Sequence, residues 1–162
     1  MNINIINYKH FRGRYIIYDS NGIGKEYLGY NDTLIFEGKY LKGKRNGKGK
    51  EYYGNGNLYF EGEYLNNKRN GKGKGYSFSG KLLFEGEYKN GKRNGKGKEY
   101  YYNGELLFEG EYLDNNKLLG TQYNKNGDVI YKLNNMNEKG KEFFNDNNIL
   151  FECEWKWKRK RI

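Results

Sequence analysis

The sequence predicts an all-β fold, an elongated single-layer antiparallel sheet in which β-hairpins follow one another as a meander. First, the chain of 162 residues repeats one motif every 24 residues, most clearly in FEGEYKNGKRNGKGKEYYYNGELL at 84–107. Second, aromatic residues and glycines alternate with charged residues in each copy, which is the period of a strand. Third, Asn-Gly pairs separate these stretches and are strong hairpin signals. Such self-similarity indicates a stack of units rather than one globular core.

The composition is very polar, yet it favours an ordered chain. Hydrophobic residues make up 35% of the sequence, the net charge is +10, and there are 24 glycines and no proline. A chain of this polarity could be disordered. The 18 tyrosines argue against disorder, because those of the repeats recur at the same position in each copy. Burying a large side chain contributes roughly 1.5–3 kcal/mol to stability. Helix is disfavoured, since each interior glycine costs about 1 kcal/mol relative to alanine.

Cysteine usage and hydropathy set the expected compartment. Cys153 is the single cysteine, so neither an internal disulfide framework nor a cysteine zinc site is expected. No apolar run approaches membrane-spanning length, and the first residues lack the apolar core of a secretory signal. We therefore expect an intracellular protein of the cytoplasm, the cytoskeleton or the membrane periphery. Frequent Asn, Lys, Ile, Tyr and Phe, which have AT-rich codons, also fit a large-virus particle.

The chain divides into three expected parts. Residues 1–10 alternate apolar and polar side chains and are expected to form a capping edge strand. The repeat array is expected over 11–155, starting with a divergent copy, FRGRY at 11–15. Near-identical copies occupy 34–105, and the pattern fades beyond them, as terminal repeats do when they cap rather than stack. A basic tail, 156–162, follows.

Each copy is expected to form one hairpin. FEGEY is the first strand, KNGKRNG contains the turn, and GKGKEYYY runs back as the second strand. In FEGEY the Phe, Gly and Tyr face one side and the acids the other. With 12–14 strands about 4.8 Å apart, the sheet would be roughly 60 Å long. The expected core consists of Phe36, Gly38, Tyr40, Phe60, Gly62, Tyr64, Phe84, Gly86, Tyr88, Phe108, Gly110 and Tyr112. The glycines leave room for rings to lie flat on the backbone.

These residues resemble the MORN repeat, whose usual form is Y-x-G-x-W-x-x-G-x-x-x-G-x-G. Gly86, Tyr88, Gly91, Gly95 and Gly97 fall on that pattern in order, and the resemblance covers 11–155. The unit here is one residue longer than the common one, Phe replaces the first Tyr, and Tyr replaces the Trp. The YYYNGELL spacing is closer to a variant form found in bacterial antitoxin-like proteins. The resemblance implies a twisted antiparallel sheet in scaffolds, membrane junctions, cytoskeletal organisers or targeting modules, often homodimeric and without catalysis in the repeats.

The motifs that could carry catalysis are better explained as structure. GKRNGKGK at 43–50 looks like a phosphate-binding loop, but its spacing is one residue short and Gly49 stands where Ser or Thr should be. His10, Cys153 and the few serines form no credible nucleophile–base pair. The Glu pairs recur like a solvated strand face. We expect no catalytic residue, no metal site, no cofactor and no small-molecule substrate.

The basic clusters are the candidate binding residues. On a meander they would form a positive stripe along one edge and, with the tail, suit an anionic partner such as a lipid surface. The plainer alternative is charge for solubility and Glu–Lys pairing across strands. Sheet twist would let a flat membrane meet only one or two loops. The candidates are Lys44, Arg45, Lys48, Lys68, Arg69, Lys72, Lys92, Arg93, Lys96, Lys156, Lys158, Arg159, Lys160 and Arg161.

Three functional hypotheses remain from the sequence. The leading one is a non-catalytic scaffold that binds protein partners, or further copies of itself, through open sheet edges. The second is a peripheral adaptor for anionic membrane lipids, acting through the basic loops and the tail. The third is an antitoxin-like binding protein. Nucleic acid is disfavoured, because the sheet claims most repeat aromatics that would stack on bases.

Overall fold

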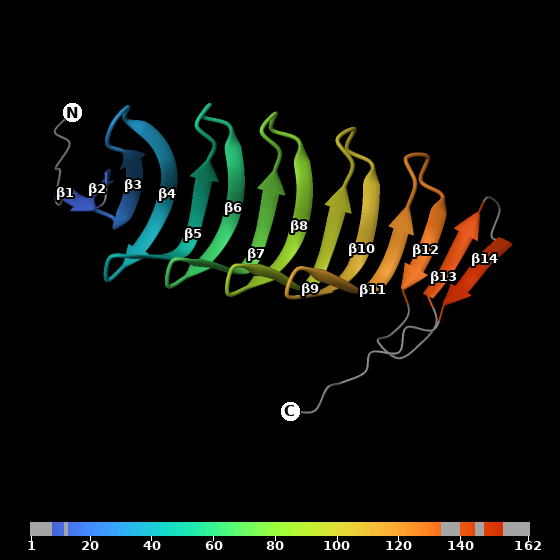
Figure 1. The fold of residues 1–162 in the computed structure, drawn as a ribbon. Coiled ribbons are helices and arrows are strands. Elements are labelled where there is room, and N and C mark those ends of the chain that lie inside the picture. Colours follow the sequence, from blue (N-terminus) through green and yellow to red (C-terminus); the bar gives the residue numbers. More distant parts are fainter. Residues whose placement is uncertain (1–7, 12, 134–139, 145–147, 154–162) are drawn as a thin grey trace.

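The computed structural model describes residues 8–11, 13–133, 140–144 and 148–153, with side chains over 13–133. In this part of the chain fourteen strands form one antiparallel sheet in which each strand pairs with the next (Figure 1). The all-β meander predicted from the sequence is confirmed. The first seven strands are β1 (Tyr8–Phe11), β2 (Arg14–Tyr18), β3 (Ile23–Leu28), β4 (Thr33–Leu41), β5 (Lys44–Tyr52), β6 (Leu58–Leu65) and β7 (Lys68–Tyr76). The others are β8 (Leu82–Lys89), β9 (Lys92–Tyr100), β10 (Leu106–Leu113), β11 (Asn116–Tyr123), β12 (Val129–Leu133), β13 (Gly140–Phe144) and β14 (Asn148–Cys153).

From β4 to β11 the turns along one edge of the sheet contain only two residues. Asn90 and Gly91, between β8 and β9, have φ angles of 53° and 89°. Positive φ at both central positions is the type I′ geometry, which matches the twist of the flanking strands. KNGKRNG contains the turn, as expected, but only Asn90 and Gly91 form it, because β9 already begins at Lys92. The basic residues lie in a strand, where a register shift between Gly86 and Tyr88 accommodates them.

From β5 to β12 the connections along the other edge are five residues long, for example residues 53–57 between β5 and β6. The amide of Tyr53 donates to the carbonyl of Asn57 at 2.9 Å, which closes the loop. Its hydroxyl donates to the carbonyl of Tyr76 in the next repeat at 2.8 Å. Successive loops are thereby joined as well as successive strands.

The core is a row of phenylalanines, one from each of β4, β6, β8 and β10. Phe36 is fully buried, although the sheet has a single layer. Its ring lies on the backbone of Gly49, where a Cβ atom would come within 2.5 Å of the ring. Tyr40 and Tyr64 meet the ring edge-on, with centroids 5.6 and 5.2 Å away, and the Arg45 guanidinium covers it at 4.0 Å. These contacts are the favoured geometries for aromatic and cation–π pairs.

The same arrangement recurs and couples the repeats. Phe60 and Phe84 are likewise covered by Arg69 at 4.1 Å and Arg93 at 4.2 Å. Each of these rings also contacts a tyrosine of the following repeat, and Phe84 packs against Tyr112 at 5.3 Å. Because every ring needs its neighbouring repeat to be enclosed, stability depends on stacking, as in other repeat arrays.

The N-terminal end differs from the expected pattern. FRGRY was expected to begin a divergent copy of the repeat, whose first strand is FEGEY in the other copies; here β1 ends at Phe11, Gly13 lies in a turn with φ of 74°, and β2 begins at Arg14. Positive φ in this short connection places FRGRY across a hairpin. Residues 8–10 of the expected capping strand belong to β1, which pairs with β2. Residues 1–7 and the basic tail lie outside the described residues.

Candidate binding surfaces

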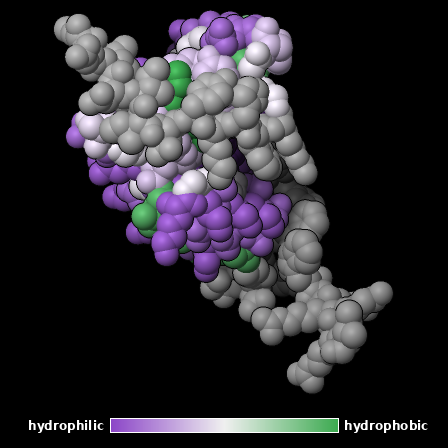
Figure 2. All heavy atoms as spheres, turned by 90° about the vertical axis from the view of Figure 1, so that its left-hand side faces the viewer, coloured by the Kyte–Doolittle hydropathy of each residue, from purple (hydrophilic) through white to green (hydrophobic). Residues whose placement is uncertain are grey.

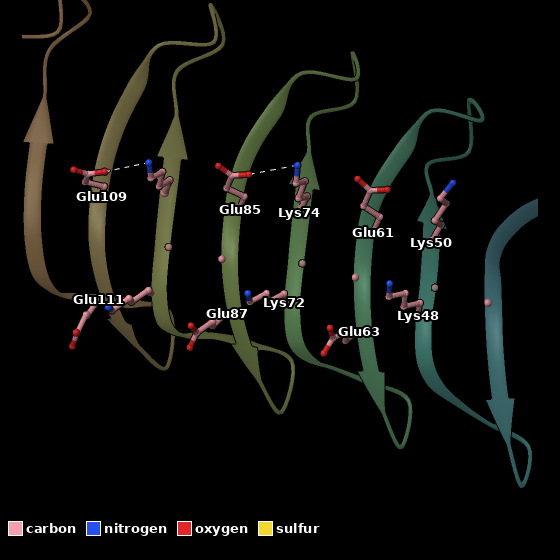
Figure 3. Close-up of a pocket in the computed structure, with 18 of the residues that line it drawn as sticks. Lys48, Lys50, Glu61, Glu63, Lys72, Lys74, Glu85, Glu87, Glu109 and Glu111 are labelled. Carbon is pink, nitrogen blue, oxygen red and sulfur yellow. Dashed lines mark ion pairs between the residues drawn. The ribbon is translucent and has the colours of Figure 1, made fainter.

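The face opposite the phenylalanines forms a long groove, called the trough below. Residues on either side of each core glycine point to this face, because side chains alternate along a strand. The trough has a volume of about 1110 Å³ and extends from Ile23 in β3 to Thr121 in β11. Figure 3 shows its glutamates and lysines projecting from the same face of successive strands. The charged lining is Glu37, Lys48, Lys50, Glu61, Glu63, Lys72, Lys74, Glu85, Glu87, Lys96, Lys98, Glu109 and Glu111.

Charges of opposite sign alternate along the trough in two rows. In one row Lys50 stands opposite Glu61, and the same pairing recurs in the following repeats. In the second row Lys48 stands opposite Glu63. Figure 3 marks the ion pair between Lys74 and Glu85, with 3.5 Å between Nζ and Oε2. Such exposed pairs contribute only about 0–1 kcal/mol each. The trough therefore presents ordered charge of both signs with little net excess.

Tyrosines hold one row of glutamates in place. The hydroxyls of Tyr52 and Tyr76 donate to Glu37 and Glu61, each in the preceding strand, at 2.7 Å. Tyr100 donates to Glu85 in the same way. Burial is the larger cause and this hydrogen bond the second, and together they raise the pKa of Tyr100 to about 12. The Tyr100 hydrogen bond, with Lys74 and Lys98 nearby, outweighs burial and lowers the pKa of Glu85. The carboxylates of this row are thus oriented before any ligand arrives.

The other face, called the arginine face below, carries a network of partly buried charged side chains. The guanidinium of Arg45 donates to Glu26 at 2.6 Å and to Glu51 at 3.4 Å. Arg69 of the next repeat donates to Glu51 at 2.6 Å, and the Tyr64 hydroxyl donates to it at 2.8 Å. Each of these carboxylates therefore joins two repeats, and charge-assisted bonds of this kind are the strong ones.

The pKa of Glu26 shows that pairing prevails over burial in this network. Burial alone would raise the pKa of this carboxyl. Hydrogen bonds from Arg45, the charge of Arg45, and hydrogen bonds from Tyr40 and Arg14 more than offset that effect, so the pKa is lowered. The same interactions raise the pKa of Arg45 against its own desolvation. Both groups stay charged at neutral pH.

The structure splits the predicted positive stripe into three groups. Arg45, Arg69 and Arg93 cover the phenylalanines and are paired with glutamates, so they do not lie free along an edge. Lys48, Lys72 and Lys96 line the trough instead. Lys44, Lys68 and Lys92 are exposed beside the two-residue turns, where Lys92 lies 3.5 Å from Asp114. Lys156, Lys158, Arg159, Lys160 and Arg161 lie outside the described residues. Binding of an anionic partner by any of these groups stays a prediction.

Glutamates of the second strand are the functional residues that the sequence reasoning missed. Glu51 and Glu99 follow the core glycines Gly49 and Gly97 by two residues, so strand alternation puts them on the arginine face. That spacing was the available signal. The predicted second strand already contained Glu99, but its partner Arg93 was expected in the turn, so their pairing was not predicted.

The part of the chain that the structure describes contains neither a metal-binding cluster nor the phosphate-binding loop that the sequence resembles. No cluster of three or more His, Cys, Asp or Glu side chains there could hold a metal ion. The stretch that looks like a phosphate-binding loop is strand β5, followed by strand β6 rather than a helix. None of the described residues forms a helix able to span a membrane. Hydrophilic side chains cover most of the coloured surface seen from the N-terminal end in Figure 2.

A single sheet of stacked hairpins, with one face packed on Phe, Tyr and Arg, defines a hairpin-repeat protein. Three stretches of the chain, 36–58, 60–74 and 84–105, match the MORN repeat family model. These stretches of the chain are MORN repeats. MORN repeats generally mediate interactions with proteins or membranes and are not known as catalytic. A search of curated proteins found no match.

Proposed function

We propose that this chain is a non-catalytic scaffold that binds an elongated segment of another protein along the trough. The observation that carries the proposal is the continuity of the trough, which extends as one groove over nine strands, from β3 to β11. A volume of about 1110 Å³ is at the upper end of ordinary ligand sites and is here spread along a line. That shape suits a polypeptide segment better than a compact small molecule.

The alternating charge indicates what kind of segment fits. A purely anionic ligand would face the trough glutamates as well as the lysines, and like charges in contact are costly. A protein segment that carries both acidic and basic side chains can meet both signs. Equivalent charges recur every two strands, which is about 9.6 Å along the array. The partner is therefore expected to present matching charges at about this interval.

A second candidate is the surface of an anionic membrane, favoured by the exposed lysines beside the two-residue turns. Lys42, Lys44, Lys68 and Lys89 lie there in exposed positions. Each basic residue near an anionic surface contributes about 1 kcal/mol. These lysines lie along one edge of the sheet and are separate from the trough, so the two candidates can be distinguished by mutation.

Two variants of equal charge test the proposal. The trough variant changes Lys50, Lys74 and Lys98 to Gln, and the edge variant changes Lys44, Lys68 and Lys92 to Gln. Both would be used with the wild-type chain to capture proteins from the native source, with quantitative mass spectrometry as readout. The proposal expects the trough variant to lose the partner and the edge variant to keep it. Loss of the partner by the edge variant alone would refute the proposal. Loss of anionic-liposome sedimentation by the edge variant would support the membrane candidate.

A further inference from the structure

The network on the arginine face is interrupted at one position. Arginine or lysine alternates with glutamate along this face until the third repeat, where Gly75 takes the place that Glu51 and Glu99 hold in their own repeats. Positions 51, 75 and 99 are 24 residues apart, which is one repeat. Along the chain the row reads Arg14, Glu26, Arg45, Glu51, Arg69, Gly75, Arg93, Glu99 and Lys117.

The interruption removes one carboxylate partner from each of two arginines. Arg45 is paired with two glutamates, Glu26 and Glu51. Among the carboxylates that the structure describes, Arg69 is paired with Glu51 alone and Arg93 with Glu99 alone. By repeat equivalence, a glutamate at 75 would be the second partner of both. Arg69 and Arg93 therefore have no carboxylate between them, whereas a glutamate lies between the other neighbouring basic residues of the row. Each guanidinium has five N–H donors, so a single glutamate does not exhaust them.

A third donor faces the same place. The hydroxyl of Tyr64 donates to Glu51, and that of Tyr40 donates to Glu26. Tyr88 is the equivalent residue beside Gly75, and its hydroxyl lies 3.7 Å from the place that a Cβ at Gly75 would occupy. Burial raises the pKa of Tyr88, and the positive charge of the nearby Arg93 opposes that rise. The donors that hold a glutamate in the other repeats are thus also present here.

The space beside Gly75 is open, and the neighbouring Arg69 and Arg93 make it positively charged. The Tyr88 hydroxyl is the nearest atom to a Cβ built at Gly75, and nothing approaches more closely. The exposed fraction of Arg93 is 30%, against 17% for Arg45, so its guanidinium is more accessible to solvent. Arg69 is held on two sides, by Phe60 at 4.1 Å and Tyr59 at 4.7 Å, which limits its side-chain motion.

We infer that Arg69, Arg93 and Tyr88 form a binding site for a carboxylate supplied by an aspartate or glutamate side chain of another protein. The incoming carboxylate takes the position that the glutamate side chain takes in the neighbouring repeats, and arginine favours its planar geometry. The site lies on the face opposite the trough, so it is a second contact that does not depend on the proposed function.

Titration of a glutamate probe tests the inference. The probe is N-acetyl-glutamate methylamide, titrated into the full ¹⁵N-labelled chain at constant ionic strength, with the Nε–H signals of the arginines as readout. Saturable shifts are expected at Arg69 and Arg93, with none at Arg45, whose carboxylate partners are both present. The neutral probe N-acetyl-glutamine methylamide should produce no shift. In the Gly75→Glu variant a side chain of the chain itself occupies the site, and affinity for the probe should fall at least tenfold.

The control variant is Gly54→Glu, which adds the same charge in a loop where nothing lies within 4 Å of a built Cβ. It should bind the probe like the wild type. Equal shifts at Arg45, unchanged affinity in Gly75→Glu, or binding of inorganic phosphate with no response to the glutamate probe would each overturn the inference.

Discussion

The close packing of phenylalanine on glycine predicts opposite effects for two substitutions in the same strand. Gly73 and Gly75 are two residues apart in β7, face the same side and do not have positive φ. A Cβ at Gly73 would lie 2.7 Å from Cε2 of Phe60 and 3.2 Å from the carbonyl oxygen of Glu61. A Cβ at Gly75 would meet only the Tyr88 hydroxyl, at 3.7 Å. The pair therefore separates steric contact from the general effect of replacing glycine.

The magnitudes follow from the contacts. Phe60 is fully buried and cannot withdraw from Gly73 without losing its cover by Arg69 at 4.1 Å. Overpacking in a core costs about 1–3 kcal/mol, and full loss of a buried phenylalanine about 3–5 kcal/mol. Gly73→Ala is expected to lower the free energy of unfolding by about 2–4 kcal/mol. Gly75→Ala is expected to raise it by about 0.4–1 kcal/mol, because the unfolded chain loses conformational freedom.

Urea unfolding followed by far-ultraviolet circular dichroism measures both changes, with the wild-type chain as reference. A Gly73→Ala variant within 0.5 kcal/mol of wild type would refute the description of the core, taking about 0.5 kcal/mol as the usual range for substitutions that touch nothing. Equal destabilisation by Gly75→Ala would also refute it, because the loss would then come from glycine replacement in general.

Three further predictions concern buried polar groups. Among the described side chains, the hydroxyl of Tyr112 is buried without a hydrogen-bond partner, so Tyr112→Phe should leave the free energy of unfolding unchanged or raise it. Tyr64→Phe, which removes the bond to Glu51, should lower it by about 1–2 kcal/mol in the same urea assay. Arg69→Gln should lower it by about 1–3 kcal/mol, because Glu51 loses a charge-assisted bond; a loss below the assay error would contradict the network. Stability should also depend on pH at both extremes, as measured by thermal unfolding. The lowered pKa of Glu26 contributes stability that is present above pH 4.5 and is lost as the pH falls through the folded-state value. The raised pKa of Tyr100 contributes stability that is present below pH 10 and is lost as the pH rises toward 12. A melting temperature that stays constant across either range would contradict these assignments.

Most of the architecture can be predicted from the sequence, because each residue type recurs at the same position of the repeat. The period of 24, the Asn-Gly pairs and strand alternation are enough to predict one hairpin per copy. They also place Phe84, Gly86 and Tyr88 on one face. Hairpin formation and the alternation of side chains depend on residues that are close together in the chain, so both can be predicted from the sequence.

The arginine face was not predicted, because it depends on turn length. The sequence does not reveal that Asn90 and Gly91 alone form the turn, so the residues that follow were assigned to a loop rather than to β9. Once β9 begins at Lys92, the register places Arg93 opposite Tyr88 and over Phe84. The trough was also missed, since its depth comes from the curvature of the whole sheet and not from any one repeat.

Site-specific photo-crosslinking tests the proposed function most directly. Lys74 in the trough, and in a separate chain Tyr102 in an exposed loop, would each be replaced by p-benzoyl-phenylalanine, and the chains irradiated in the native source. The proposal predicts a covalent adduct with a discrete protein partner from position 74 and none from position 102. Adducts from position 102 alone, or equally from both positions, would contradict binding along the trough.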